Sequence, residues 1–109
     1  MQIDNFPFQT LDWNSVPAAE HKGTTGVALW KIFHMGVIRI RMVSYSSNYF
    51  ADHWCRKGHI IYCISGEMIT EVEDGRAFVL SQGMNYQVGD NSHAHKSRSA
   101  NGCTLFIVD

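Results

Sequence analysis

Hydrophobic and polar residues alternate with a period of two in the middle of the chain, most clearly between positions 37 and 45. Ile38, Ile40 and Met42 alternate there with Arg39 and Arg41. Because successive side chains of a β-strand point to opposite faces, this pattern predicts a half-buried strand. We expect its apolar side chains to pack inward and its two arginines to face solvent or another subunit.

Two further strand patterns lie on either side of a predicted turn. Residues 59–65 are nearly all apolar, which favours a strand covered on both faces, and residues 67–73 alternate again. Asp74 and Gly75 then separate this segment from another strand pattern at residues 76–80. Asp-Gly between two strands is typical of a type I′ turn, in which both central residues take positive φ. The sequence therefore predicts a two-residue β-hairpin.

Other short strand patterns occupy residues 27–33, 85–88 and 103–108, and no segment sustains a helical period over about 11 residues. Many short strands with turn signals every ~8–12 residues indicate a sandwich, jelly roll or barrel. The predicted fold class is all-β, a single domain with two packed antiparallel sheets. Its barrel would span residues 27–109, and residues 1–26 would form an arm on the barrel or on a partner subunit.

Composition and charge argue against several classes of function. The chain has 109 residues, of which 45% are hydrophobic and 17% charged, as in a globular domain with one core. Its net charge is -1 and its basic residues are scattered, which argues against nucleic-acid binding. No apolar run approaches the ~20 residues of a membrane helix, and no signal-peptide pattern opens the chain. We expect a cytoplasmic protein that binds neither nucleic acid nor membranes.

The three cysteines are expected to be free thiols. An odd number cannot pair fully within one chain, and a protein without a secretory signal would usually keep its thiols reduced. Cys63 and Cys103 lie within apolar runs, so we expect both to be buried as small hydrophobic side chains. Cys55 differs because polar and charged residues surround it.

His53, Cys55 and His59 form a dense group of candidate metal ligands. Imidazole and thiolate bind borderline-soft metals readily. Residues i and i+2 of a strand share a face, so we expect His53 and Cys55 to project together. A three-residue loop at 56–58 that ends in a glycine would set Cys55 opposite His59, with Cβ atoms roughly 4.5–5.5 Å apart. The sequence thus predicts a metal site in a β-structure.

A fourth ligand must come from elsewhere, and a second histidine cluster reads Ser-His-Ala-His at residues 92–95. Either His95 or His93 would close a tetrahedral set. Tyr86 and His93 are also candidates for the lining of a pocket near the metal. The alternative is a polar cavity whose histidines and cysteine bind no metal.

The spacing of these residues resembles the first sequence motif of the cupin superfamily. That motif runs Gly-x5-His-x-His-x3,4-Glu-x6-Gly, and its last four marked positions fall here on His53, Cys55, His59 and Gly66. Ser47 stands at the first glycine, and the second cupin motif is matched through its histidine, at His95. The letters Asp-His-Trp-Cys at residues 52–55 also resemble, in a different order, a subgroup of small cupins labelled by a DHCW motif.

The resemblance covers roughly residues 37–109 and implies a small jelly-roll β-barrel, often a homodimer, with a metal ion inside. In this chain a cysteine and a histidine replace a histidine and the glutamate of the family's ligand set. Three imidazoles and one thiolate lean toward zinc, with nickel, copper or iron as alternatives. Cupins host diverse reactions, so the resemblance implies no particular one.

Three functional hypotheses stay open at this point. The metal would act as a Lewis acid on a small oxygenated metabolite, or the chain would be a non-catalytic small-molecule-binding module with a structural metal. In the third hypothesis it is a metal-free dimeric barrel. Whether the protein is an enzyme is undecided, and an open coordination position on the metal separates the first hypothesis from the second.

Overall fold

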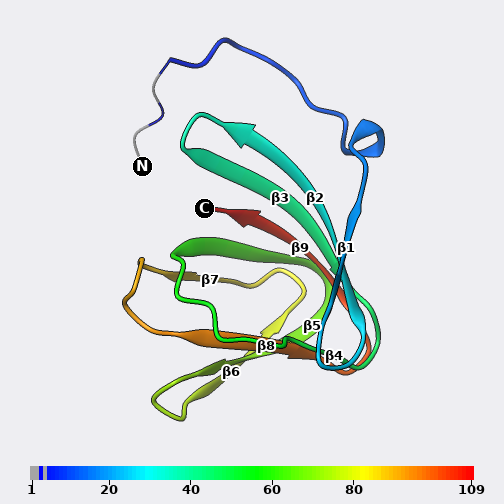
Figure 1. Ribbon diagram of the computed structural model, residues 1–109, viewed down its shortest axis with the longest axis vertical. Helices are drawn as coiled ribbons and strands as arrows, with labels where there is room; N and C mark the ends of the chain where they lie inside the picture. Colours follow the sequence, from blue (N-terminus) through cyan, green and yellow to red (C-terminus); the bar gives the residue numbers. More distant parts are fainter. Residues whose placement is uncertain (1–2, 4) are drawn as a thin grey trace.

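The computed structural model describes residue 3 and residues 5–109, which form nine strands and one short 3-10 helix. In chain order the elements are η1 (Trp13–Ser15), β1 (Ala19–Lys22), β2 (Val27–Met35), β3 (Ile38–Tyr45), β4 (Tyr49–Phe50), β5 (His59–Val72), β6 (Ala77–Ser81), β7 (Asn85–Val88), β8 (His95–Ser99) and β9 (Cys103–Val108). Figure 1 shows how these strands curl around one interior. No helix in the part of the chain that the structure describes is long and apolar enough to cross a membrane.

The long strand β5 belongs to both layers of the structure. Its first half pairs with β9 and β7, in the layer that continues through β3 and β2 to β1, and its second half pairs with β6 and β8. The register shifts between Cys63 and Ser65, and Gly66 follows with φ of +78°. A Cβ at Gly66 would lie 2.4 Å from the carbonyl oxygen of Gly102, so only glycine fits this crossing. The all-β, jelly-roll prediction is confirmed.

The core lies between the two layers. Its least exposed members are apolar side chains from β2, β3, β5 and β9, together with both cysteines predicted to be buried; they include Ala28, Val43, Cys63, Met68, Cys103 and Leu105. Buried residues occupy alternate positions along the strands, and in β5 this alternation changes phase after the irregularity between Cys63 and Ser65. The predicted burial of Cys63 and Cys103 is therefore confirmed, at 0% and 6% exposure.

The predicted orientation of β3 is wrong, although its period is right. Arg41 points inward and is 5% exposed, on the same face as Val43, whereas Ile40 and Met42 lie on the outer face. Asp109 accounts for the difference, because its carboxylate accepts hydrogen bonds from both Arg39 and Arg41 on the inner face. A buried cation that has a carboxylate partner is tolerated, and alternation alone does not reveal that partner.

The predictions for β5 and its hairpin have different outcomes. The strand was expected to be covered on both faces; within the single chain only its inner face is covered, and Ile60, Tyr62 and Ile64 are 44%, 43% and 38% exposed on the outer face. The predicted hairpin loop is wrong. The hairpin loop has three residues rather than two, because Val72 N–H donates to the Arg76 carbonyl. Only its last residue, a glycine, has positive φ, so a type I′ turn does not form.

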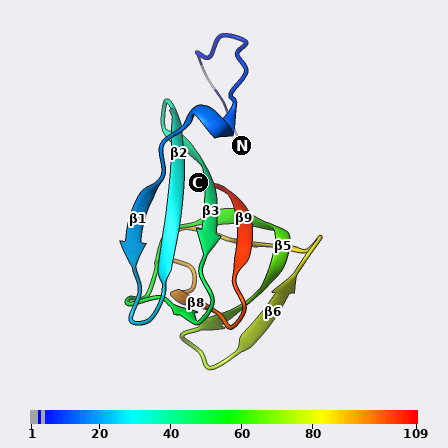
Figure 2. The same cartoon turned by 90° about the vertical axis from the view of Figure 1, so that its right-hand side faces the viewer.

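The segment before β2 contributes one edge strand. Figure 2 shows β1, β2, β3 and β9 next to one another, and β1 pairs antiparallel with β2. Trp13 of η1 packs edge-on against Phe106 of β9, and Lys31 Nζ donates to the Trp13 carbonyl oxygen over 3.0 Å. The arm predicted over residues 1–26 thus lies in part against the outer face, while positions 1, 2 and 4 fall outside the described residues.

Candidate metal centre

A two-way backbone pair brings Cys55 to His95. Cys55 lies in the segment between β4 and β5, which is not a strand, but its N–H donates to the His95 carbonyl over 2.8 Å. The His95 N–H donates back to the Cys55 carbonyl over 2.9 Å. Residues that exchange both bonds in an antiparallel pair carry their side chains on the same side of the sheet. The thiol therefore lies beside the imidazole at the start of β8.

The segment from Cys55 to His59 is held by the loop after β7. Gly58 N–H donates to Asp90 Oδ1 over 2.7 Å, and Asn91 N–H donates to the Arg56 carbonyl over 2.9 Å. A Cβ at Gly58 would lie 2.5 Å from the Asp90 backbone nitrogen, so the two chains approach as closely as a glycine permits. His59 then opens β5 with its ring directed into the barrel, opposite Val88 of β7.

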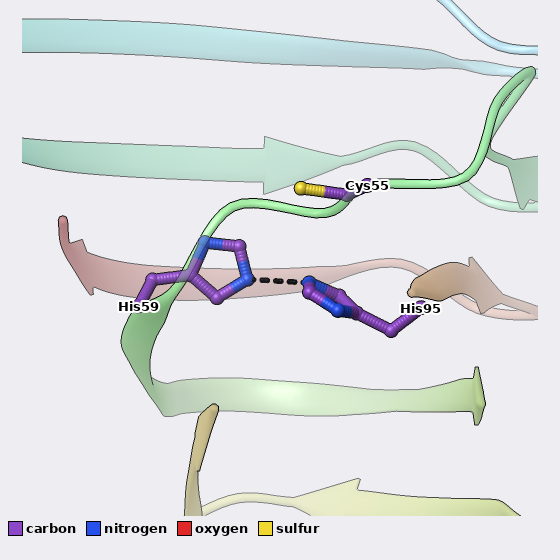
Figure 3. Close-up of side chains that lie close together, drawn as sticks. All are labelled: Cys55, His59 and His95. Atoms are coloured by element: carbon purple, nitrogen blue, oxygen red, sulfur yellow. Dashed lines mark hydrogen bonds between the residues drawn. The ribbon is translucent and has the colours of Figure 1, made fainter. Parts of the chain in front are cut away.

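Three of the four predicted ligands come together at this point. One ligand atom from each of Cys55, His59 and His95 lies within 4.8 Å of the others. Nε2 of His59 and Nε2 of His95 are 2.7 Å apart, as the dashed line in Figure 3 marks. Both imidazoles are buried, at 8% and 4% exposure, and the thiol is half-buried.

The acceptor on the far side of each ring determines which nitrogen faces the centre. Nδ1 of His95 lies 2.9 Å from the His93 carbonyl oxygen, which only accepts, so this nitrogen carries the proton. Nδ1 of His59 makes no hydrogen bond to the described residues, but it lies 3.4 Å from a carboxylate oxygen of Asp109, and this anion also favours a proton on Nδ1. In the neutral rings both Nε2 atoms then present lone pairs to one another. A proton or a metal cation must lie between them.

The residues present fit a metal ion. A tetrahedral zinc with Zn–N bonds of about 2.0–2.1 Å would hold two nitrogens about 3.3 Å apart, so the two Nε2 atoms, which are 2.7 Å apart, need to separate by about 0.6 Å. One thiolate and two imidazoles are donors that a borderline-soft divalent cation prefers. The outer contacts of His59 and His95 are those that ligand histidines make in metal sites.

The surroundings of Cys55 favour the deprotonated form of its thiol, which is the form that binds a metal. Interaction with the His95 imidazole lowers the pKa of the Cys55 thiol, although desolvation opposes it. Burial lowers the pKa of His95, but its contacts with Cys55 and the His93 carbonyl outweigh burial and raise that pKa overall. For His59 burial dominates, and the pKa is lowered. A cation that enters the group would displace the proton held there.

Asp109 is a residue of the site that the sequence pattern did not indicate. Its side chain is fully buried, and Oδ2 lies 2.7 Å from Arg41 Nη2 and 3.4 Å from His59 Nδ1. Burial raises the pKa of this carboxyl, but His59, Arg39 and Arg41 outweigh it and hold the pKa well below its usual range. Two arginines on one strand of a small barrel were the available signal, because inward-facing cations need an anionic partner.

His53 stays apart from the other three candidates. Its side chain is 76% exposed, and its Nδ1 lies 2.6 Å from Asp52 Oδ1 rather than near the cluster. The expected i, i+2 arrangement with Cys55 is wrong, because residues 51–58 do not form a strand. The expected hairpin between Cys55 and His59 is wrong for the same reason.

The two predicted pocket residues line one cavity together, and only Tyr86 also lines the cavity of the candidate ligands. Tyr86 of β7 has its ring 6.1 Å from the rings of both His59 and His95, and its buried hydroxyl has no hydrogen-bond partner among the described residues. His93 lines a neighbouring cavity of about 280 Å³ together with Tyr86 and His95. The cavity that contains Cys55, His59 and His95 has a volume of about 240 Å³, and Tyr86 lines it too.

No protein-family profile matches the chain, and no curated protein matches it in sequence. Solved structures do match in fold. Ectoine synthase from P. lautus is 15% identical with a TM-score of 0.72, and the match covers 93% of this chain and 76% of that one. A cupin-2 domain protein from Shewanella frigidimarina is 14% identical with a TM-score of 0.60, over 73% of this chain and 78% of that one.

A third similar structure is Fe(II)-HppE with an alternative substrate. It is 10% identical with a TM-score of 0.76, and the match covers 94% of this chain and 60% of that longer one. At these identities the likeness establishes the fold alone. The chain has the cupin fold, as the resemblance of its first motif implied.

Proposed function

We propose that this cupin-fold chain is a metal-binding protein in which Cys55, His59 and His95 hold a divalent cation inside the barrel, with zinc as the first choice. The observation that carries the proposal is the pair of buried imidazoles whose Nε2 atoms face each other across 2.7 Å. The outer nitrogen of His95 faces the His93 carbonyl and that of His59 faces the Asp109 carboxylate at 3.4 Å, so the inner nitrogens are available to a cation.

Three protein ligands would leave one position of a tetrahedral ion for water or a substrate oxygen, as in catalytic zinc sites. A bound cation supplies Lewis-acid polarisation of a carbonyl or hydroxyl oxygen. The chain's own residues would orient the ligand histidine and enclose the substrate. Asp109 faces the outer nitrogen of His59, and Tyr86 lines the cavity beside both rings. The proposed activity is metal-assisted chemistry on a small oxygenated metabolite. The HppE neighbour, which contains Fe(II) together with a substrate, supports a metal and a ligand sharing such a barrel.

The second candidate is a non-catalytic binding module with the same metal. The observation that favours it is the cavity of about 240 Å³, which extends from the ligand group to Trp30 and Tyr45. In this case a small molecule would occupy the cavity unchanged. Incubation of metal-loaded protein with candidate metabolites, followed by mass analysis of the small molecules, separates turnover from retention.

Metal analysis of purified protein tests the ligand assignment. The wild-type chain should hold one zinc per chain, and His59→Ala and His95→Ala should each weaken zinc binding by more than the roughly 10- to 100-fold that loss of an outer hydrogen-bond partner costs. Cys55→Ser should weaken it as well. The exposed His34 provides a matched control, His34→Ala, and His53→Ala should also retain the metal.

Circular dichroism of each variant separates loss of a ligand from loss of the fold. Full zinc affinity in both His59→Ala and His95→Ala would overturn the proposal. Purified wild-type protein that takes up no zinc, nickel, copper or iron would favour the metal-free barrel instead.

We also propose that the chain forms a homodimer through the outer face of β5. Ile60, Tyr62 and Ile64 expose their side chains on the outer face of β5, next to Phe106 and Val108 of β9. A monomeric protein rarely leaves a contiguous apolar face uncovered, which supports a homodimer. The three free cysteines support a reducing compartment such as the cytoplasm.

A further inference from the structure

The metal-site cavity also has a wall of fixed positive charge. Arg39, Arg41 and Lys57 line it, and no Asp or Glu lines it among the residues that the structure describes. Lys96 lines it too, but its ammonium lies over the Phe50 and Trp54 rings, which are not part of this cavity. Asp109 lies behind this wall, where it contacts both arginines but is not exposed to the cavity. The Asp109 carboxylate and a deprotonated Cys55 thiol together carry less charge than the two guanidinium groups and the Lys57 ammonium, which leaves excess positive charge at this end of the cavity.

Arg41 is the innermost of these cations. Its side chain is 6% exposed, and its guanidinium carbon lies 4.7 Å from the centre of the Trp30 ring. Nη2 donates to Asp109, whereas the buried Nε has no hydrogen-bond partner in the part of the chain that the structure describes. A buried donor without a partner is costly, and the cost is removed when an acceptor enters. A guanidinium group matches the two oxygens of a carboxylate particularly well.

Asp109 places this guanidinium close to the metal ligands. The same oxygen, Oδ2, lies 2.7 Å from Arg41 Nη2 and 3.4 Å from His59 Nδ1. The cavity opens to solvent beside Lys57 and His53, which are exposed and also line it. Its volume of about 240 Å³ is below the roughly 300–1,000 Å³ of pockets for drug-sized ligands, which favours a metabolite-sized occupant.

We infer that the cavity binds a small carboxylate, whose carboxyl group contacts Arg41 and whose second oxygen group points toward Cys55, His59 and His95. This inference rests on the proposed metal function for the orientation of the ligand, but its charge follows from the cationic wall alone. Tyr86, with a buried and unpartnered hydroxyl, is placed to contact the same ligand.

Glycolate, glycolamide and inorganic phosphate test the inference. Glycolate carries a carboxylate and a hydroxyl, and glycolamide keeps the shape without the charge. Each is titrated by calorimetry into the full chain, both metal-free and loaded with cobalt, whose visible spectrum reports on the ligands of the ion. Glycolate should bind at least tenfold more tightly than glycolamide in both forms. It should perturb the cobalt spectrum as well.

Arg41→Gln should weaken glycolate binding by roughly 10- to 100-fold, which corresponds to the loss of a hydrogen bond to a charged group. It should leave one cobalt per chain. The control Arg56→Gln, at a cation that is 62% exposed outside the cavity, should bind glycolate normally. Arg41→Lys, which keeps the charge, should retain more glycolate affinity than Arg41→Gln. It also provides a test if the glutamine variant does not fold.

The results that would reject the proposed metal site differ from those that would reject the carboxylate site. A wild-type chain that takes up no cobalt but still prefers glycolate to glycolamide would reject the proposed metal function and keep the carboxylate site. Equal affinity for glycolate and glycolamide, or an Arg41→Gln variant with unchanged glycolate affinity, would overturn the inference. Tighter binding of phosphate than of glycolate through Arg41 would also overturn it, in favour of a phosphate site.

Discussion

Oδ2 of Asp109 lies 3.4 Å from Nδ1 of His59, on the side of the imidazole opposite to the candidate metal position. The residue that directly follows the last strand, β9, thus supplies an anion to the first residue of β5. Arg39 and Arg41 hold this carboxylate with bonds of 2.8 and 2.7 Å, so the anion is rigidly placed. This relationship connects the buried charges of the barrel to the tautomer of one candidate ligand.

Asp109→Asn should lower zinc affinity by about 10- to 100-fold, because ligand histidines lose basicity and orientation when the outer acceptor is lost. Competition with a chromophoric chelator measures this change. The matched control Asp74→Asn, at an exposed aspartate whose partner is Arg76, should leave the affinity unchanged. Unchanged zinc binding in Asp109→Asn would remove Asp109 from the site.

The Asp109 carboxylate should also make the free energy of unfolding depend on pH in the acidic range. The pKa of Asp109 in the folded chain lies below its value of about 4 in the unfolded chain. Its contribution is therefore complete above about pH 4 and decreases as the pH falls below that value, because the unfolded state then binds the proton more readily. Urea unfolding of metal-free protein over a series of pH values measures this loss. In Asp109→Asn the loss below about pH 4 should be smaller; an identical acid response would contradict the assignment.

Gly58→Ala should displace the segment that carries Cys55 and His59. The new Cβ would meet the Asp90 backbone nitrogen at 2.5 Å and the Gly89 carbonyl carbon at 2.8 Å, neither of which can move without the loop. We expect a loss of about 1–3 kcal/mol in the free energy of unfolding, together with weaker zinc binding. Gly89→Ala is the control, because its Cβ would meet nothing closer than 3.8 Å. Equal effects of the two substitutions would show that the close approach at Gly58 is not required.

Cys55 should be the reactive thiol of the three. Its pKa is lowered by His95, whereas burial raises the pKa of Cys63 and raises that of Cys103 to about 11. Iodoacetamide should therefore modify Cys55 roughly tenfold faster or more in metal-free protein, because the thiolate is the reacting species. Peptide mass analysis identifies the modified position, and zinc should protect it. Reaction at Cys55 that is equally fast with and without bound zinc would argue against this thiol as a ligand.

Tyr62→Lys should convert a homodimer into monomers, because it places a charge in the centre of the apolar outer face of β5. Light scattering coupled to gel filtration reports the mass directly. Val37→Lys, at a fully exposed apolar residue in the β2–β3 turn, tests whether any added lysine has this effect. A wild-type chain that elutes with the monomer mass would refute the dimer.

The sequence determined the chemistry and the local conformation of this protein. Period-two alternation and turn residues were enough to predict strands at β2, β3, β5, β6, β7 and β9, because alternation is a local consequence of strand geometry. Short polar strands such as β8, which carries His95, lack that signal and were not predicted. The residue types at positions 55, 59 and 95 were likewise sufficient to suggest a metal site with nitrogen and sulfur donors.

Only the tertiary structure decided which donors meet and which strand faces are buried. Alternation defines two faces of β3 but does not say which is inside, and the buried contact between Arg41 and Asp109 joins residues 68 positions apart. His53 is adjacent to the site in sequence and is exposed, whereas His95 arrives through a backbone pair with Cys55. Such pairings depend on long-range strand registers, which the short-range spacing of residues does not encode.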